Sequence, residues 1–521
     1  MPTEHKSYDL LIVGGGINGA GIARDAAGRG LKVLLCERDD LAEHTSSAST
    51  KLIHGGLRYL EYYEFSLVRK ALKEREILLR SAPHIIWPMR FVMPHTRNLR
   101  PRWMIRLGLF LYDHLGGRSK LQRSQALKLR EHEAGEPLHA DFVNGYAYSD
   151  CWVQDSRLVI LNAMDASERG AEVRTRTSCI KAERLTDTWS IQLRDEHTGT
   201  IETVRARGLV NAAGPWVSTF LQNIAGEQRR QSDKSVRLVK GSHVVVPRLF
   251  DHPYSYLLQN QDGRVVFVIP YEKDYTLIGT TDEAFEGDAR GIRISEGETD
   301  YLCRTVAHYF RRTITPDDVV WSYAGVRPLY DDHAEDASAV TRDYVLDLDH
   351  AQGEAPLLSV FGGKITTYRT LAEEVIAKLA RPLGITTPDW TAGEALPGGD
   401  IADADFERWL SGLSDTYPFL PVHLLWRYAR NYGTRIASLI GSASAMADLG
   451  EHLGDDLYEA ELVYLIRYEW AQTADDVLWR RSRMGLHVSD ATRQAVDAWF
   501  HERGTAPPAD REQERVALSH H

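Results

Sequence analysis

Short apolar runs alternate with amphipathic stretches over the first 385 residues of the chain. Apolar or β-branched runs predict strands at Tyr8–Val13, Leu31–Cys36, Glu172–Cys179, Val236–Pro247, Val265–Thr281, Asp317–Pro328 and Leu357–Phe361. Trp189–Leu193 and Thr200–Val204 predict a hairpin, and Phe65–Ser81 predicts a charged scaffold helix with an apolar stripe. From Phe406 to Phe500 the period is helical and strand signals are few, so we expect a helical C-terminal domain.

The turn between the first two strands carries the strongest signal. The first strand leads into Gly14-x-Gly16-x-x-Gly19, a helix is predicted over Ala20–Arg29, and the second strand ends at Glu37. Glycines at this spacing permit a tight turn and a close approach of the backbone to a pyrophosphate, while the acid can accept hydrogen bonds from a ribose diol. The helix N-terminus favours the same anion. The pattern predicts a dinucleotide site, and Glu37 favours FAD or NAD over NADP.

Length and composition predict a globular protein of two or three domains, with 521 residues and ordinary apolar and charged fractions. The four cysteines lie far apart and form no CxxC pair, so we expect no metal site, no disulfide framework and a reducing compartment. We expect no signal peptide, and no apolar run reaches the length of about 18 residues typical of a membrane span. The net charge of −11 argues against nucleic-acid binding.

One segment departs from this acidic balance. Arg97–Arg130 holds nine basic side chains against Asp113 alone, and it encloses the apolar stretch Trp103–Tyr112. Large apolar residues flanked by arginines are typical of a helix that lies in a membrane interface, here with Ile105, Leu109 and Phe110 in the acyl boundary. A buried helix with basic ends and an RNA-binding face are the alternatives for this segment.

Two polar segments that follow Glu37 are candidates for ligand binding. Thr45, Ser46, Ser47 and Ser49 form a hydroxyl-rich loop that could bind pyrophosphate oxygens. The segment His54-Gly55-Gly56-Leu57-Arg58-Tyr59 comes next, and its glycines let the backbone approach a ligand. Arg58 suits a substrate anion, because a guanidinium group can bind a phosphate or carboxylate with two hydrogen bonds.

Two later strands also end in small residues. One ends at Asn211-Ala212-Ala213-Gly214, and Leu357–Phe361 ends at Gly362-Gly363-Lys364, with a helix expected to begin near Ile365. A helix N-terminus at this second turn suits the O2 edge of a flavin ring, where reduction places negative charge. An NAD domain is usually one contiguous block, so this late return of the pattern favours FAD.

Three further polar residues are weak signals when taken singly. His243 lies in a predicted strand, where a lone histidine is more often structural than catalytic. Arg327 and Arg342 follow strand-like segments, and an isolated arginine more often makes a surface salt bridge than a ligand contact.

Taken together, the motifs resemble the aerobic, FAD-dependent sn-glycerol-3-phosphate dehydrogenases. The matching segments run in the order of that family and read GGGINGAGIARDAAGRG, TSSASTKLIHGGLRYLE, GLVNAAGPW, KGSHVVVP, GVRPL and LLSVFGGKITTYRTLAE. The resemblance implies an α/β fold: a Rossmann-like FAD domain of the D-amino-acid-oxidase (glutathione-reductase-2) type, a mixed-sheet substrate domain and an all-helical C-terminal domain. We expect an interleaved oxidoreductase region over residues 1–385, a linker over 386–399, the helical domain over 400–504 and a polar tail over 505–521.

The resemblance also implies an activity. It is the oxidation of sn-glycerol 3-phosphate to dihydroxyacetone phosphate, by hydride transfer to non-covalent FAD and electron transfer to a membrane quinone. It places the enzyme on the cytoplasmic face of the cell membrane, and this strengthens the prediction of peripheral attachment through Arg97–Arg130. A homodimer stays open as an assembly, and the acidic net charge predicts no nucleic-acid partner.

The resemblance suggests roles for individual residues. His243 is expected to be the base, with Arg327 as an alternative that binds the alkoxide, and Lys364 stabilises the reduced flavin or the developing carbonyl. Arg58 and Arg342 bind the phosphate, and Tyr59 adds a hydrogen bond. The expected cofactor-binding residues are Gly14, Gly15, Gly16, Gly19, Glu37, Thr45, Ser46, Ser47, Ser49, Cys179, Ala213, Gly214, Gly362, Gly363, Lys364 and Thr366.

Several alternatives stay open at this point. An oxidase would deliver the electrons to O₂, and another FAD-dependent oxidoreductase would act on a hydroxy acid or an amine. A flavoprotein that binds RNA through Arg97–Arg130, or a sensor without turnover, would belong to other functional classes.

Overall fold

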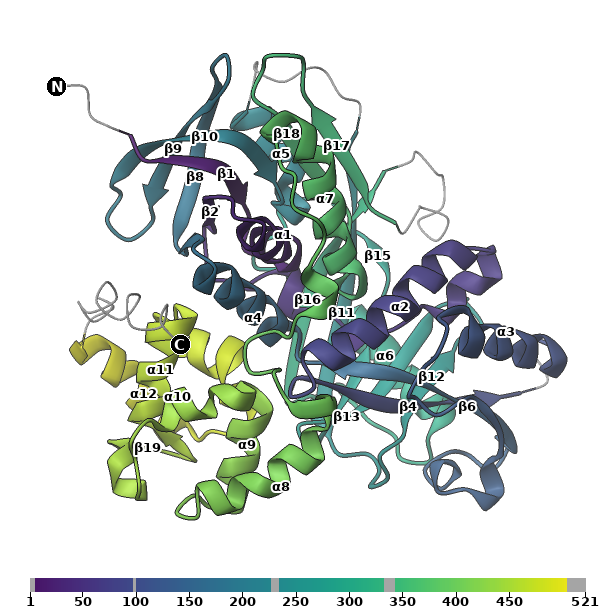
Figure 1. Ribbon diagram of the computed structural model, residues 1–521. Helices are drawn as coiled ribbons and strands as arrows, with labels where there is room; N and C mark the ends of the chain where they lie inside the picture. The colour runs from purple at the N-terminus through teal and green to yellow at the C-terminus, as the bar shows by residue number, and fades with distance from the viewer. Residues whose placement is uncertain (1–4, 97–99, 226–233, 332–342, 504–521) are drawn as a thin grey trace.

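The computed structural model describes residues 5–96, 100–225, 234–331 and 343–503. Two large sheets lie side by side, and a helical C-terminal domain packs below the first of them (Figure 1). Arg97, Arg342 and the tail 505–521, all named in the predictions above, lie outside the described residues.

The first sheet is the dinucleotide-binding layer. Its path runs β17-β18-β10-β1-β2-β7, with β9 on β10 and β8 on β9. The central strands β18, β10, β1, β2 and β7 are parallel, as a doubly wound fold requires. The bounds are β1 (Ser7–Val13), β2 (Val33–Cys36), β7 (Glu172–Arg174), β8 (Thr177–Arg184), β9 (Trp189–Asp195), β10 (Ile201–Asn211), β17 (Val345–Asp349) and β18 (Leu357–Phe361).

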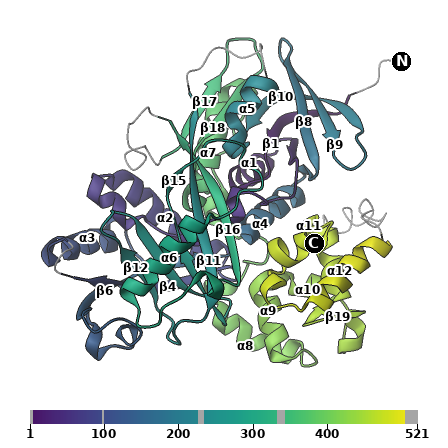
Figure 2. The ribbon, with the colours of Figure 1, turned by 180° about the vertical axis from the view of Figure 1, so that it is seen from behind.

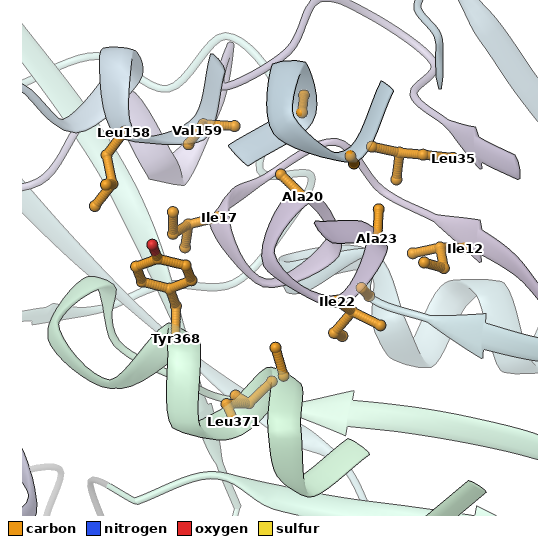
Figure 3. Close-up of a cluster of buried hydrophobic side chains, with 14 of the residues drawn as sticks. Ile12, Ile17, Ala20, Ile22, Ala23, Leu35, Leu158, Val159, Tyr368 and Leu371 are labelled. Carbon is orange, nitrogen blue, oxygen red and sulfur yellow. The ribbon is translucent and has the colours of Figure 1, made fainter. Parts of the chain in front are cut away.

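Three helices far apart in the sequence cover one face of this sheet. They are α1 (Ile17–Gly28), α4 (Asp155–Glu168) and α7 (Tyr368–Leu383), and α5 (Val217–Asn223) lies on the opposite face. Helix α1 is sandwiched between the other two, where Ala20 and Ala23 allow close packing and Ile22 and Tyr368 fill the space (Figure 3). The core therefore joins the N-terminal motif to residues near position 370.

The second sheet is mixed and forms the substrate side. Its path runs β15-β11-β14-β13-β12-β4-β6-β3, with β16 on β11 and β5 on β6. The bounds are β3 (Leu52–Ile53), β4 (Ile86–His95), β5 (Gln125–Lys128), β6 (Asn144–Val153), β11 (Val236–Pro247), β12 (Ser255–Gln259), β13 (Val265–Tyr271), β14 (Tyr275–Gly279), β15 (Glu283–Ala284) and β16 (Trp321–Tyr330). Helices α2 (Phe65–Ser81) and α3 (Arg102–Leu115) cover one face, and α6 (Glu296–Tyr309) covers the other (Figure 2).

Two strand predictions need correction. The stretch Glu172–Cys179 is two strands, because β7 pairs in parallel with β2 whereas β8 pairs antiparallel with β9, and Arg176 takes a φ of 49° at the bend between them. The stretch Val265–Thr281 is a hairpin, β13–β14, with left-handed residues at Glu272 and Lys273.

The C-terminal domain is built mainly from helices around its own apolar core, from Ile401 to Phe500. The bounds are α8 (Phe406–Thr416), α9 (Val422–Tyr432), α10 (Ile436–Ile440), α11 (Glu459–Glu469), a π-helical turn (Asp476–Arg481) and α12 (Asp490–Arg503). The expectation of an all-helical domain is corrected by a short ribbon, β19 (His452–Gly454) with β20 (Leu457–Tyr458). Segment 386–399, which we expected to be a linker, is packed: Leu396 is buried and Trp390 donates to the Asp25 carbonyl at 3.2 Å.

Candidate active site

Three glycine-bearing turns meet at one edge of the first sheet. They follow β1, β10 and β18, whose carboxyl ends lie together because these strands are parallel neighbours. A Cβ at Gly14 would stand 2.5 Å from the Ala212 carbonyl oxygen, so the first two turns touch. The Asn18 amide donates to the Gly362 carbonyl at 3.1 Å, which joins the first turn to the third. This edge is where an open α/β sheet binds its ligand.

The glycines and Glu37 behave as the dinucleotide pattern predicts. A Cβ at Gly19 would lie 1.8 Å from the Gly14 carbonyl oxygen, so only glycine permits this packing of helix on turn. The half-buried Glu37 carboxylate accepts hydrogen bonds from Gly15 N at 2.6 Å and Asp39 N at 2.8 Å. Burial raises its pKa, and these two N–H groups oppose the rise. Asp39 and His44 stand close enough to Glu37 to share a metal ion, but they bind one another at 2.8 Å.

A cavity of about 2230 Å³ opens along this edge and continues over the face of the second sheet. It exceeds the roughly 300–1,000 Å³ of an ordinary ligand pocket, as a dinucleotide and a substrate together require. The predicted residues that line it are Gly14, Gly16, Glu37, Thr45, Ser46, Ser49, Arg58, Tyr59, Cys179, Ala213, Gly214, Arg327, Gly362, Gly363, Lys364 and Thr366.

Within the described part of the chain, four of the predicted site residues do not line the cavity: Gly15, Gly19, Ser47 and His243. Gly15 and Gly19 shape the turn through their backbone, as stated above. Ser47 hydrogen-bonds the carbonyl of His44 at 3.2 Å and faces a smaller neighbouring pocket. His243 lies one layer behind the cavity wall.

The local geometry fits FAD at two helix N-termini. Helix α1 has no side-chain cap at Gly16, and a Cβ there would come within 3.0 Å of the Ser46 hydroxyl, which accepts a hydrogen bond from Ile17 N. This uncapped turn suits a pyrophosphate. The second N-terminus, at Ile365–Thr367 and α7, follows Gly362 and Gly363 in left-handed conformations.

Ser49 contacts protein groups that were not foreseen. Its hydroxyl donates to Asp155 at 2.7 Å, and the same carboxylate binds the buried ammonium of Lys51 at 2.8 Å. Lys51 in turn donates to the Ser47 carbonyl at 3.0 Å. These contacts fix the hydroxyl-rich loop from behind, so Ser49 has a structural task in addition to its place in the cavity wall.

Cationic groups gather at the end of the cavity beside the second sheet. The Lys364 ammonium stands 4.0 Å from the centre of the Tyr59 ring, a cation–π contact. The Arg327 guanidinium binds Asp282 at 2.6 Å and Thr280 at 3.0 Å. Arg58 lies on the same wall, where its contact with Tyr62 is 3.5 Å. This end can attract an anion.

His243 is enclosed by protein. Its side chain is 1 % exposed, its ring stacks on Tyr323 at 4.7 Å, and its Nε2 lies 3.0 Å from the Thr50 hydroxyl, which does line the cavity. Burial, with Arg327 and Lys51 nearby, holds its pKa well below the usual value. The imidazole is therefore neutral and reaches the cavity through Thr50.

His54 is a site residue for which sequence reasoning assigned no role. It lines the cavity, and its backbone N–H donates to the Thr366 hydroxyl at 3.3 Å. Burial lowers its pKa; Lys364, Arg75 and Arg327 act in the same direction and Asp150 opposes them. The signal that could have found it is its place beside Gly55 and Gly56 in the HGGLRY segment.

A buried network supports the turn after His54. The Gly55 N–H donates to the Tyr112 hydroxyl at 2.8 Å, and that hydroxyl donates to Asp150 at 2.7 Å. Arg75 binds the same carboxylate at 2.9 Å. Helices α2 and α3 therefore fix the backbone that presents His54 and Arg58.

Comparison with known proteins fits this geometry. Residues 9–369 match the model of the FAD dependent oxidoreductase family. The chain belongs to that family. Residues 390–502 match a second model, the C-terminal domain of alpha-glycerophosphate oxidase. The fold expected from the motifs is confirmed, and the cofactor is FAD.

Relatives cover nearly the whole chain. A D-erythritol 1-phosphate dehydrogenase of Brucella abortus is 53% identical over 95% of this chain and 98% of its own. A glycerol-3-phosphate dehydrogenase of Pseudomonas aeruginosa is 52% identical over 92% and 93%, and the aerobic enzyme of Escherichia coli is 49% identical over 95% and 98%. The resemblance to aerobic glycerol-3-phosphate dehydrogenases is confirmed.

A solved structure agrees. The glycerol-3-phosphate dehydrogenase of Bacillus halodurans, complexed with FAD, superposes with a TM-score of 0.78 at 27% identity and covers 99% of this chain and 94% of its own. The chain is thus an FAD-dependent oxidoreductase in fold and in family.

Proposed function

We propose that this enzyme oxidises sn-glycerol 3-phosphate to dihydroxyacetone phosphate. The observation that carries the proposal is the group of cations Arg58, Lys364 and Arg327, which lies at the end of the cavity beside the late glycine turn. A phosphate monoester needs such charge-assisted contacts. The names of the relatives from Pseudomonas aeruginosa and Escherichia coli support the same substrate.

The residues divide the work as follows. FAD, when bound, supplies the hydride acceptor. Arg58 binds the phosphate, with Arg342 as a second ligand that lies outside the described residues. Arg327 and Lys364 favour the alkoxide and lower the pKa of the substrate alcohol, since a fixed positive charge stabilises the anion. A neutral imidazole accepts the proton, and there are two candidates. His54 lines the cavity and would accept the proton directly, whereas His243 would accept it through the Thr50 hydroxyl.

Anaerobic mixing tests the proposal. The FAD-loaded enzyme with sn-glycerol 3-phosphate should lose its flavin absorbance near about 450 nm, because the oxidised ring accepts a hydride. Glycerol without the phosphate should leave the band almost unchanged. A flavin that bleaches equally with both compounds would remove the phosphate site from the proposal.

A four-carbon substrate is the second candidate. The Brucella abortus relative named as a D-erythritol 1-phosphate dehydrogenase is as similar to this chain as the glycerol-3-phosphate enzymes are. Both substrates carry a phosphate and a secondary alcohol, so the cations at the cavity end serve either. Comparing kcat/KM for the two compounds decides between them, and the larger value names the substrate.

We place the electron acceptor at the membrane. Helix α3 presents an apolar outer face with Trp103 65 % and Phe110 57 % exposed, together with Met104 and Leu107. Tyr62, Tyr63 and Phe65 extend this face beside α2, and several of these side chains line the cavity. A membrane quinone that enters the cavity from this face would reach the turn at Gly362 and Gly363, where we expect the flavin ring. Among the described residues, no helix combines the length and the hydropathy that a bilayer crossing needs.

The predicted membrane face needs a correction. Leu109 is 2 % exposed, so it cannot enter a bilayer, and Ile105 is half-buried against the core under α3, whereas Phe110 is exposed. With Trp103, Met104 and Leu107, Phe110 forms what we call the outer α3 face. The basic residues near this helix suit anionic head groups, and we propose peripheral attachment to the inner face of the cell membrane.

An oxygen-reducing enzyme is the competing outcome. Peroxide formed under air is compared with electron transfer to a short-chain quinone at equal substrate. A high peroxide yield and slow quinone reduction would assign the enzyme to the oxidases.

A further inference from the structure

A buried ion network ties the ribose-binding bend to the C-terminal domain. Asp40 lies three residues after Glu37 and is 1 % exposed. Arg481 binds it with both terminal nitrogens, at 2.6 and 2.8 Å, and Arg480 adds a contact at 2.6 Å. Arg176, at the β7–β8 bend, binds the same carboxylate at 3.1 Å. One carboxylate thus receives three guanidinium groups, two of them from the C-terminal domain.

The arginines are themselves held in place. Arg481 also donates to the Glu469 carbonyl at 2.9 Å and is fully buried. Arg176 binds Asp476 at 2.8 and 2.9 Å, and Asp476 also receives Arg480. Burial alone would raise the pKa of Asp40, but the arginines hold that pKa below its usual range, so the carboxylate is charged. A charged group in this position is stable only while its partners are present.

The bend between Glu37 and Asp40 is short, so fixing one end fixes the other. The Asp39 N–H donates to the Glu37 carboxylate at 2.8 Å, and the Arg176 N–H donates to the Asp39 carbonyl at 2.9 Å. Asp40 and Glu37 both line the cavity. The orientation of the Glu37 carboxylate therefore depends on Arg480 and Arg481. Both are described by the structure, but neither lines the cavity.

We infer that Arg480 and Arg481 are positioning residues for FAD, and that the C-terminal domain supports the adenosine side of the site from behind the cavity wall. The domain docks beside α4 on the first sheet (Figure 2). Its arginines set the Glu37–Asp40 bend in the shape that accepts the ribose diol. The inference rests on FAD binding alone and is independent of the substrate proposed above.

The test uses full-length enzyme, stripped of FAD and titrated with FAD while flavin fluorescence is followed. Arg481→Met and Asp40→Asn should raise the Kd for FAD by about tenfold or more, the equivalent of about 1.4 kcal/mol. At saturating FAD, kcat and the KM for the substrate should stay near the wild-type values in Arg481→Met, because Arg481 is not part of the cavity wall. Arg481→Lys, which keeps one charge, should recover part of the affinity.

The matched control breaks another ion pair of the same domain. Arg483 binds Glu272 on the β13–β14 turn, and among the described residues it is not one of the arginines that bind Asp40. Arg483→Met should lower the melting temperature but leave the Kd for FAD within about twofold of wild type. Arg480→Gln, a change at a less buried site, serves if Arg481→Met does not fold. Unchanged Kd in the Arg481 and Arg480 variants, or an equal rise in Arg483→Met, overturns the inference.

Discussion

His54 and His243 lie near the cations Arg327 and Lys364 or Lys51, and burial lowers the pKa of both imidazoles, so both are neutral. A neutral imidazole can accept a proton, and it loses this ability when the pH falls through its lowered pKa. The rate constant of flavin reduction should therefore fall only below the usual pKa of histidine, about 6.5. Above that pH the rate constant should be flat.

We predict that His54→Gln slows flavin reduction by roughly two to four orders of magnitude and removes the acid limb of the pH profile. His243→Gln should have a smaller effect, because that ring reaches the cavity only through Thr50. Stopped-flow absorbance measures both, and flavin content is the control. If only His243→Gln removes the acid limb, His243 is the base, as expected from sequence.

Arg58 is predicted to bind the substrate phosphate. Arg58→Ala should lower kcat/KM for sn-glycerol 3-phosphate by about 10–150-fold, the equivalent of a charge-assisted contact of about 1.5–3 kcal/mol. Most of the change should be in KM, and flavin content should stay at the wild-type level. Unchanged steady-state kinetics would place the phosphate elsewhere.

At the scale of elements, a helix around Trp103–Tyr112 was predicted and is observed as α3, but which of its side chains are buried was not predicted correctly. Its apolar residues cover most of its circumference and leave one polar side, so periodicity could not separate Leu109 and Tyr112 from Trp103 and Phe110. Tertiary contacts determine which side chains of α3 are buried. Tyr112 points inward because its hydroxyl donates a hydrogen bond to Asp150. A similar limit explains why one strand was predicted where β7 and β8 lie, since only pairing with β2 and β9 shows the bend.

The outer α3 face gives a prediction for membrane binding. Trp103→Ser, Leu107→Ser and Phe110→Ser together should move the enzyme from liposomes of anionic lipid to the supernatant, because the apolar face then has no affinity for the acyl boundary. Activity with a soluble dye should persist. Leu109→Ser is the contrasting variant: it should lower the melting temperature without selective release. Wild-type liposome binding by the triple variant would contradict the assignment.

At the scale of the whole molecule, local sequence motifs predicted the edge of the first sheet that binds the cofactor. They did not predict the contacts between distant residues that hold this edge in place. The turns at Gly14 and Gly362 are coded by neighbouring residues and were predicted. The roles of Asp40 and of Arg481 depend on residues about 440 positions apart in sequence, which no local pattern relates. The sequence also could not predict that His243 on β11 is enclosed by protein, because Tyr323, which stacks on it, comes from β16.

His84 makes global stability depend on pH. It is 0 % exposed, neither ring nitrogen has a hydrogen-bond partner among the described residues, and burial beside Arg157 and Arg430 lowers its pKa to about 3. The unfolded chain takes up the proton first, near pH 6.5, so this part of the stability is present above about 6.5 and is lost as the pH falls towards 3.

Replacing His84 by leucine should remove that dependence. At pH 5 the wild type should lose about 2 kcal/mol relative to pH 8 through this group, and His84→Leu should lose correspondingly less. Urea unfolding at the two pH values measures the difference. Parallel losses in both proteins would show that His84 is not the group responsible.

The meeting of the turns after β1, β10 and β18 also has a consequence for synthesis on the ribosome. Helix α1 leaves the exit tunnel early, yet the helix α7 that covers it is made some 350 residues later. The ribosome adds about 5–20 residues per second, so the apolar side of α1 stays uncovered for many seconds before α7 is made. Until then the nascent chain exposes Ile22 and its neighbours to other chains. The cofactor site is therefore completed late, and chaperones that shield apolar helices are expected to raise the yield of flavin-loaded enzyme.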